Sequence, residues 1–397
     1  MQGPSSMRRT LYTSNMNGNN KVSVNFAAIE PYVVVNMPLP VERQMAGREW
    51  VSWGENNAYP DYLLALYKSV PTLGSVIDGC VDYVTGDGIA VRPFHQGLAD
   101  GAVNLRGDTV TEQVRDLARD WETYGGFALQ VIRDRAGRPV ELYYIDMRYL
   151  RSDRDNEVFY YSESWGRAGR KDVRVYPKWM NIDQARWQAM TDEERNRHAS
   201  GIVLVKSDHT QVYPAPGYAS AVVACEIEKC IDQYHLNAIG NGFAPSIIIN
   251  FNNGVPTDEI KKQIEKDVME KFCGPGNAGR VLLSWNMNRE NQTTFQVPQT
   301  HDFGERYNAL AARSRQQIFT AFRANPNLFG IPTENNGFSN EQYEESFRLF
   351  NRTHIRPVQR LICSAYDKIL GTSGSVTITP FTMDGGDGTV SGNNGEA

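Results

Sequence analysis

Residues 328–340 read LFGIPTENNGFSN, an apolar turn that runs into a polar segment. Proline fixes its own φ angle, and glycine reaches backbone conformations that other residues avoid, so Gly330 and Pro332 predict a rigid elbow. The residues after it are short, polar and glycine-bearing, which is typical of an exposed loop. Helical patterns lie on both sides, at 304–323 and 340–370. The stretch therefore predicts an anchored elbow and a pliable loop between two long helices.

The helix after this loop has one apolar stripe, with an interruption. Its members recur at spacings of three and four, as on one face of a helix. They are Tyr343, Phe347, Phe350, His354, Val358, Leu361, Ala365 and Ile369. Pro357 lies within the pattern and removes one backbone hydrogen bond, so we expect a kink near 353–357 or two separate helices. His354 is on the apolar stripe, where we expect a hydrogen-bonded packing histidine.

The segment before the loop predicts two more long helices around a small insert. Residues 218–239 form an uninterrupted helical pattern, and 304–323 form the second. Between them lie a strand at 245–251, a helix at 257–272 and a strand at 279–285. This β-α-β unit is too small to fold by itself.

The N-terminal half predicts an α+β domain. Residues 53–88 read as two amphipathic helices broken at Pro71, and 111–124 read as a third. Strand-like runs follow at 127–134, 139–150 and 157–164, which we interpret as a meander, and another returns at 202–207. Residues 1–20 and 384–397 are small, polar and glycine-rich, so we expect loose tails there.

The composition excludes several classes of protein. The 397 residues carry 41 Lys and Arg against 46 Asp and Glu, a net charge of -5, which argues against a broad basic DNA-gripping face. Five cysteines without a CxxC pair indicate neither a disulfide framework nor a zinc site. There is no apolar run long enough for a bilayer span and no apolar core of a secretory signal near the N-terminus, so we expect a protein kept on the cytosolic side or in a particle assembled there.

No catalytic fingerprint is present. The chain has no GxxxxGK[ST] loop, no complete GxGxxG, no GxSxG and no HExxH. Its six histidines are scattered, and none has metal-ligand spacing to a second His or Cys. We therefore expect no catalytic residue, no metal and no cofactor. A carboxylate pair assembled by folding stays open from sequence alone, as in a monomeric α+β enzyme.

Three passages, in this order, resemble the portal proteins of tailed double-stranded DNA bacteriophages. They are WGENNAYPDYLLALYKSVPTLGSVIDGCVDYVTGDG (53–88), GYASAVVACEIEKCIDQYHLNAIGNGFAPSIIINFNNG (217–254) and LFGIPTENNGFSNEQYEESFRLFNRTHIRPVQRLI (328–362). The third contains an elbow similar to the family's FG(I/V)P. The resemblance implies a portal-like α+β fold that assembles as a ring around a DNA channel at one capsid vertex.

The resemblance also implies a division of the chain. The expected parts are a flexible arm (1–20), an α+β wing (21–216), a first stem helix (217–243), a clip (244–302), a second stem helix (303–324), a tunnel loop (325–340), a kinked tunnel helix (341–371) and a short strand with a tail (372–397). The implied channel residues are Thr333, Glu334, Asn335, Asn336, Gly337, Phe338, Ser339 and Asn340. The implied loop anchor is Leu328, Phe329, Gly330, Ile331 and Pro332, and the implied docking candidates on the clip are Lys261, Lys262, Lys266 and Lys271.

The implied partners follow from that role. They are further copies of the chain, twelve in the expected ring; double-stranded DNA; the terminase large subunit; major capsid and scaffold proteins; and head-completion or tail proteins, with no membrane. The expected location is the virion portal vertex, after assembly in the bacterial cytoplasm. Charges beside the stem stripes, such as Glu226, Glu228 and Arg315, are candidates for ion pairs between subunits. The alternatives are a soluble monomeric α+β enzyme or another structural phage-head component.

Overall fold

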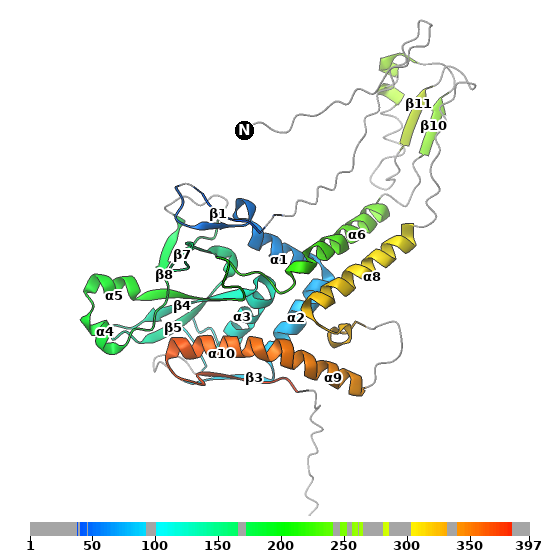
Figure 1. The fold of residues 1–397 in the computed structure, drawn as a ribbon. Helices are drawn as coiled ribbons and strands as arrows, with labels where there is room; N and C mark the ends of the chain where they lie inside the picture. Colours follow the sequence, from blue (N-terminus) through cyan, green and yellow to red (C-terminus); the bar gives the residue numbers. More distant parts are fainter. Residues whose placement is uncertain are drawn as a thin grey trace, which may run out of the picture. The chain divides into compact units, whose positions relative to one another are not determined.

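The structure is a computed structural model that describes residues 38, 40–45, 47–92, 101–165, 172–240, 247–251, 256–260, 262–264, 281–285, 303–331 and 340–382. The chain divides into two units, residues 1–36 and 37–397, and the described residues all belong to the second. Both tails, Pro332, residues 333–339, Lys261, Lys266 and Lys271 lie outside the described residues. Helices and strands are mixed throughout the described part (Figure 1), which agrees with the predicted α+β class.

Two consecutive helices form the centre of the helical part. Helix α1 (Tyr59–Ser69) ends where Pro71 begins α2 (Pro71–Thr85), as the sequence predicts. Proline is tolerated at a helix start because that position needs no backbone donor. Leu66 of α1 and Leu73 and Ile77 of α2 are completely buried. This pair therefore supplies much of the core against which later segments pack.

Helix α3 (Val110–Tyr124) packs on α2 and leads into the main sheet. Thr109 and Glu112 form a capping box at its start, which satisfies backbone donors that a helix end leaves unpaired. Gly125 ends it with φ near 80°. A side chain at Gly125 would lie only 2.0 Å from the carbonyl oxygen of Ala215, so both the backbone angle and the space require glycine.

The strands form several small sheets instead of one meander. Antiparallel β4 (Gly126–Arg133) lies between β5 (Pro139–Ile145) and β9 (Ser200–Lys206), whereas β6 (Leu150–Ser152), β7 (Val158–Tyr161) and β8 (Arg174–Pro177) form a second sheet. The run predicted as one strand over 139–150 is divided by a 3-10 turn, η2 (Met147–Tyr149). The Asp146 carboxylate accepts a hydrogen bond from the Arg148 amide, and such local bonds compete with strand pairing.

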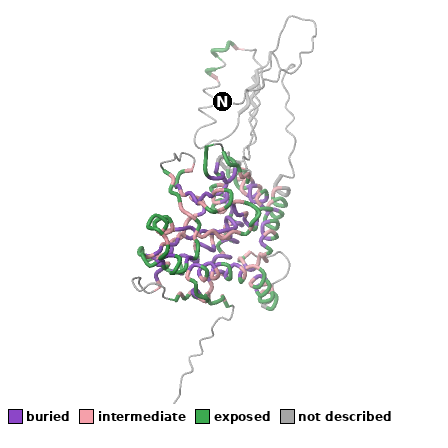
Figure 2. Tube along the Cα trace, turned by 60° about the vertical axis from the view of Figure 1, so that its left-hand side comes forward, coloured by how far each residue is buried: buried purple, intermediate pink, exposed green. Residues whose placement is uncertain are grey.

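Short elements complete the body. Strand β1 (Glu42–Gln44) pairs with β2 (Val51–Trp53), followed by the 3-10 turn η1 (Glu55–Asn57). Strand β3 (Gly88–Val91) pairs with β12 (Val376–Thr379), so the last described strand joins the segment that follows α2. Helices α4 (Gln184–Ala189) and α5 (Asp192–His198) occupy the polar stretch before β9. Buried residues gather inside this body (Figure 2), whereas α5 has none.

Two long antiparallel helices follow the body, as predicted. The 3-10 turn η4 (Ala219–Ala221) leads into α6 (Val222–Gly240), and α8 (Phe303–Phe322) runs back beside it (Figure 1). Aromatic pairs join them at both ends, with 5.4 Å between the Tyr218 and Phe322 ring centroids and 4.7 Å between Tyr234 and Tyr307. Parallel strands β10 (Ile247–Phe251) and β11 (Val281–Trp285) lie in the intervening insert.

The last helical part is interrupted just before Pro357. Helix α9 (Asn340–Phe350) passes through a π-helical segment, η6 (Asn351–Ile355), into α10 (Arg356–Leu370), whose second residue is Pro357. Proline has no amide hydrogen to give to the preceding turn, which favours a change of hydrogen-bonding pattern there. Among the described helices, none has the length and apolarity required to span a bilayer.

Candidate functional site: the anchor of the predicted tunnel loop

The elbow of the opening stretch is a 3-10 turn, η5 (Pro326–Phe329). The Asn325 side chain accepts a hydrogen bond from the Asn327 amide at its start, and Gly330 ends it in a left-handed conformation with φ of 74°. Leu328 is buried with 5% exposure, and Phe329 and Ile331 pack against the core. Four of the five predicted anchor residues are therefore described, and three of them contribute side chains to packed protein.

Tyr83 of α2 holds this turn in place. Its hydroxyl donates a 2.7 Å hydrogen bond to the carbonyl oxygen of Leu328. Its ring lies in contact with four aromatic rings drawn from three different segments, with centroid distances of 5.2 to 6.4 Å. The members of this aromatic group are Phe329, Phe347, Phe350 and Phe381. Burial, followed by the neighbouring Tyr343, raises the pKa of Tyr83, so the hydroxyl stays protonated as a donor.

Gly79 of α2 makes room for the turn. A Cβ atom at this position would lie 2.6 Å from Cδ1 of Phe329, closer than side chains pack. The Phe329 ring therefore rests directly on the α2 backbone. Because Phe329 also contacts Phe319 of α8 and Phe350 of α9, it links the two helices that flank the loop.

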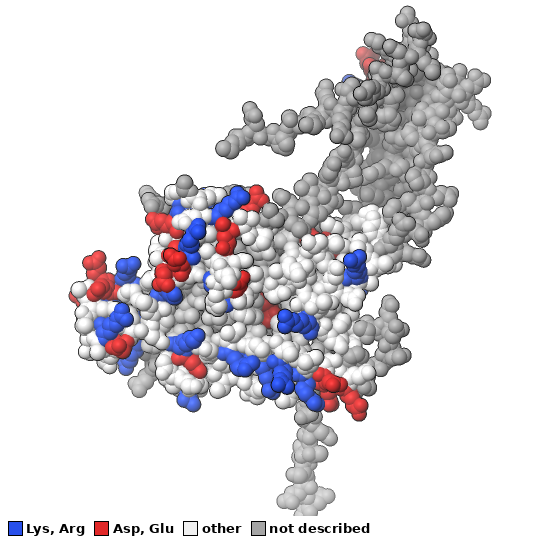
Figure 3. All heavy atoms as spheres, in the orientation of Figure 1, with Lys and Arg blue, Asp and Glu red and all other residues white. Residues whose placement is uncertain are grey.

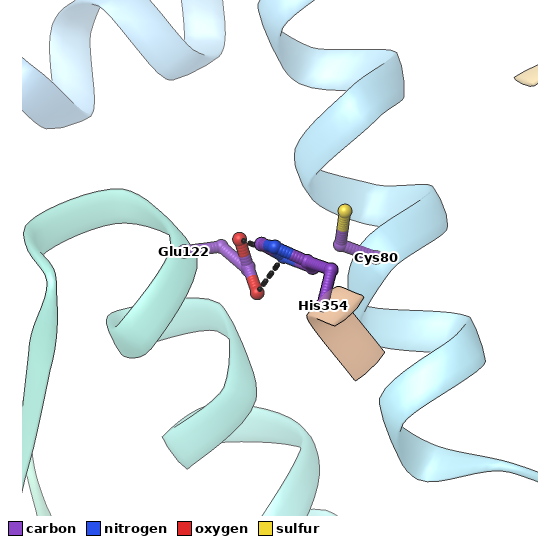
Figure 4. A group of neighbouring side chains, drawn as sticks. All are labelled: Cys80, Glu122 and His354. Atoms are coloured by element: carbon purple, nitrogen blue, oxygen red, sulfur yellow. Dashed lines mark hydrogen bonds and ion pairs between the residues drawn. The ribbon is translucent and has the colours of Figure 1, made fainter. Parts of the chain in front are cut away.

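An ion pair between the half-buried His354 and the buried Glu122 (Figure 4) lies next to this aromatic group. The ring of Phe350 stacks on that of His354, with centroids 5.1 Å apart and planes 9° apart. His354 Nε2 lies 3.0 and 3.1 Å from the two carboxylate oxygens of Glu122, whose exposure is 3%. Burial lowers the pKa of His354, but the Glu122 carboxylate outweighs it, and the pKa is raised above its ordinary value. The pair ties η6 to α3.

Cys80 completes a group whose ligand atoms all lie within 4.8 Å of one another. Thiolate, imidazole and carboxylate are donors that zinc accepts. Here, however, the imidazole bonds both Glu122 oxygens, and burial followed by the Glu122 charge raises the pKa of Cys80 well above its ordinary value. A metal would have to displace the proton between His354 and Glu122 and also the thiol proton of Cys80. The group is therefore best described as a packed ion pair beside a thiol.

Sequence reasoning identified His354 but missed Glu122 and Cys80. A usable signal exists for Glu122, because it continues the spacing of four set by the buried Val114 and Ala118 on α3. An acid in register with core positions requires a partner. Nothing in the sequence alone says that this partner comes from a residue 232 positions further on.

Two charges expected at subunit contacts are instead packed within the chain. Glu226 and Glu228 each have 7% exposure. Thr72 of α2 donates a 2.7 Å hydrogen bond to Glu228, and Lys229 lies 3.7 Å from Glu226. Glu226 and Glu228 lie on different sides of α6, and both are buried within the chain, with Glu228 bonded to α2. Arg313 and Arg315 of α8 are exposed, as is Lys262.

Two hollows among the described residues are lined by at most one carboxylate each. One hollow of about 500 Å³ is lined by Lys178, Lys206 and His209, with Asp155 as the single lining carboxylate. Burial raises the pKa of Asp120 well above its ordinary value. This carboxyl accepts hydrogen bonds from Tyr144 and Met147. It lines neither that hollow nor a second one on α10. The paired carboxylates that a carbohydrate-active enzyme needs are not brought together there.

Comparison with known proteins decides the family. The model of the phage portal protein family matches residues 107–383, more than half of the chain. The chain belongs to the phage portal protein family. The matched residues of this portal chain begin before α3 and continue through the stem-like helices, the elbow and the π-helical segment to the end of β12.

The portal chain also matches two relatives over part of their lengths. It is 28% identical over 150 residues to an uncharacterized protein of Rickettsia bellii (strain RML369-C), and this match spans 36% of each chain. It is 28% identical over 165 residues to one from Rickettsia felis (strain ATCC VR-1525 / URRWXCal2), spanning 39% of this chain and 40% of the relative. The matches thus cover well under half of these curated relatives' lengths.

A solved structure shows the same fold. A chain from the virion of a native gene transfer agent (GTA) particle has a TM-score of 0.50 and 18% identity, covering 81% of this chain and 83% of that one. The crystal structure of an HK97 family phage portal protein from Corynebacterium diphtheriae gives a TM-score of 0.43 with 10% identity, over 78% and 90% of the two chains. The first likeness shows that this chain shares its fold with that chain of the GTA virion.

Proposed function

We propose that copies of this chain assemble into a ring of twelve that forms the DNA channel at one capsid vertex, through which the genome is packaged and ejected. The family match over residues 107–383 carries this proposal. The division of the chain fits it, because an α+β body, two antiparallel helices around a small insert, an anchored elbow and an interrupted helix follow one another. We assign no turnover to the chain itself, and its work in this role is structural.

In this role the body over 21–216 is the wing, α6 and α8 are the stem, and the insert over 244–302 is the clip. Residues 333–340 are the tunnel loop, whose neutral tip of Asn335, Asn336 and Gly337 suits weak contacts with a moving phosphate backbone. The packed residues Leu328 and Phe329 fix the root of this loop. A firm root with a polar tip allows the loop to touch DNA without disturbing the ring.

The partners in this role are an ATP-driven terminase, capsid and scaffold proteins, and head-completion or tail proteins. Lys261, Lys262, Lys266 and Lys271 of the clip are the docking candidates, and Lys262 is the described member, with an exposed side chain. The location is the portal vertex of the virion, after assembly in the bacterial cytoplasm.

A deletion in the loop tests the channel role. Removing residues 335–337 should leave ring formation intact and reduce packaged or retained DNA in assembled particles, because the anchor around Tyr83 is untouched. A length-matched Gly-Ser-Gly replacement of the same three residues is the control, and it should package more DNA than the deletion. Loss of folding in the deletion variant, or unchanged packaging, would contradict the assigned role of the loop.

A further inference from the structure

A row of arginines lies on the outer side of α9, η6 and α10. Arg348, Arg352, Arg356 and Arg360 follow one another at spacings of four, and all four are exposed. Residues four apart lie on one face of a helix, so these side chains form a continuous basic stripe about 18 Å long. Figure 3 shows blue side chains gathered over α9 and α10, with red side chains at the end of α9. We call these four residues the arginine stripe.

No ion pair neutralises the arginine stripe among the residues that the structure describes. The described ion pairs involve other arginines, such as Arg115 with Asp82 and Arg148 with Asp146. The nearest acidic side chains in sequence, Glu341, Glu344 and Glu345, are exposed and form no described ion pair with Arg348. Four adjacent cations without counter-charges are unfavourable in a chain of net charge -5 unless an anion or solvent compensates them.

The stripe borders a hollow. A cavity of about 480 Å³ is lined by Arg352, Arg356 and Arg360 together with Gln359 and Cys363 of α10, Ile378 of β12 and Pro380 after it. The guanidinium groups therefore flank a concave surface and do not simply radiate into solvent. A planar guanidinium offers paired donors that match phosphate oxygens, so this arrangement suits a phosphate-bearing polymer.

We propose that the arginine stripe binds the phosphate backbone of double-stranded DNA without sequence preference. The proposal rests on the proposed function: α9 begins at the last residue of the tunnel loop, and the stripe starts at Arg348, about 12 Å further along the helix. B-form DNA presents about ten phosphates over 18 Å, ample for four guanidinium groups. The exposed apolar residues Leu349 and Leu361 lie at the two ends of the stripe, whereas a protein interface has its apolar anchors at the centre.

The test compares two double variants of the full-length protein. Arg352→Gln/Arg356→Gln removes the centre of the stripe, and Arg154→Gln/Arg197→Gln removes the same charge from exposed positions elsewhere. Arg197, Arg352 and Arg356 lie in helices, where glutamine keeps a favourable propensity, and Arg154 lies in an exposed turn, so folding should survive in both. Binding of a fluorescent 30-base-pair DNA duplex is followed by anisotropy from 50 to 200 mM salt, with the assembly state of each sample measured in parallel.

The stripe variant should bind the duplex at least about tenfold more weakly at 50 mM salt, and the slope of log K against log salt should fall by about two, one for each lost phosphate contact. The control variant should match the wild type. Two results would overturn the proposal. An equal loss of duplex binding in both variants would mean that general charge is responsible, and no loss in the stripe variant would mean that the stripe does not bind the duplex.

Two further readouts separate this proposal from others. If the stripe variant loses ring assembly but keeps duplex binding per subunit, the stripe is a subunit contact and the proposal is wrong. If the stripe binds poly-glutamate more tightly than the duplex, its partner is an acidic protein and the proposal is likewise wrong. Because duplex binding is measured whether or not the chain forms rings, failure of the portal role and failure of this proposal give different results.

Discussion

The contact between Gly79 and Phe329 fixes the root of the loop at the scale of single residues. The ring lies where a side chain on α2 would be, with 2.6 Å from Cδ1 to the position of a Cβ atom. Substitution by alanine gains roughly 1 kcal/mol of helix propensity but forces the ring to move. Overpacking in a filled core costs about 1 to 3 kcal/mol. The gain in helix propensity can therefore appear as added stability only where the Phe329 ring is absent.

A double-mutant cycle measures this contact. Gly79→Ala should lower the free energy of unfolding in the wild type and raise it, by up to about 1 kcal/mol, in a Phe329→Ala background where the clash is gone. Gly217→Ala, at an exposed glycine with nothing within 4 Å, is the control. Urea denaturation gives all values. The same effect of Gly79→Ala in both backgrounds would show that Phe329 does not rest on Gly79.

The ion pair between His354 and Glu122 makes stability depend on pH. The folded-state pKa of His354 is raised, so its contribution is complete below the ordinary histidine pKa of about 6.5 and is lost as pH rises through the folded-state pKa. His354→Gln leaves the buried Glu122 carboxylate unpaired and should cost about 3 kcal/mol at pH 6. The deficit relative to the wild type should shrink from pH 6 to pH 9.

The matched control for this measurement is His209→Gln, at an exposed histidine. Denaturation at several pH values gives the free energy of unfolding for each protein. A deficit that stays constant with pH would mean that His354 is neutral in the folded state, contrary to the raised pKa.

At the scale of elements, the root of the loop is held by a different helix from the two that it joins. Tyr83 lies on α2 and bonds the carbonyl oxygen of Leu328 in η5. Removal of this hydrogen bond should therefore loosen η5 without unfolding α8 or α9. This separates the stability of the root from that of the flanking helices.

Tyr83→Phe tests this arrangement. Loss of one hydrogen bond should cost about 0.5 to 1.5 kcal/mol of unfolding free energy and should speed amide hydrogen exchange in residues 328–331. Tyr234→Phe, where the side chain is 46% exposed, should change neither. Unchanged exchange at 328–331 in Tyr83→Phe would show that the hydrogen bond does not hold the turn.

Several elements could be predicted from the sequence because their signals are local. Pro71, the paired Gly125 and Gly126, and the elbow at Gly330 limit helices by backbone chemistry, and the stripes of α6 and α8 have a regular period. The division of the meander into two sheets was missed, because η2 depends on a side-chain hydrogen bond of Asp146. The burial of Glu226 and Glu228 was missed because it depends on α6 packing against helices formed about 150 residues earlier.

The candidate site shows the same limit. Its elbow was predicted from Gly330 and Pro332. The residues that hold the elbow, Gly79, Tyr83 and Phe381, come from segments hundreds of residues apart, so their contacts could not be predicted. The partner of His354 was unpredictable for the same reason. The arginine stripe, in contrast, is visible in the sequence as a spacing of four. Only the structure shows that it is exposed, beside a hollow and without an ion pair to any residue in the described part of the chain.

At the scale of the whole molecule, the portal role requires two different surfaces on each subunit. A closed ring joins one patch of a chain to another patch of the next. The apolar stripes of α6 and α8 are partly used within the chain, as the stacked Tyr234 and Tyr307 show. Exposed residues such as Val223, Leu236 and Leu310 remain on these two helices, and burying them between subunits would stabilise a ring.

The mass of the purified full-length protein in solution tests the central claim most directly. Native mass spectrometry, with negative-stain images of the same sample, should show rings with a central hole near twelve times 44.7 kDa, about 540 kDa. If scaffold or capsid protein is needed for assembly, the rings should form when it is added. A particle that stays at 44.7 kDa with and without those partners would contradict the account.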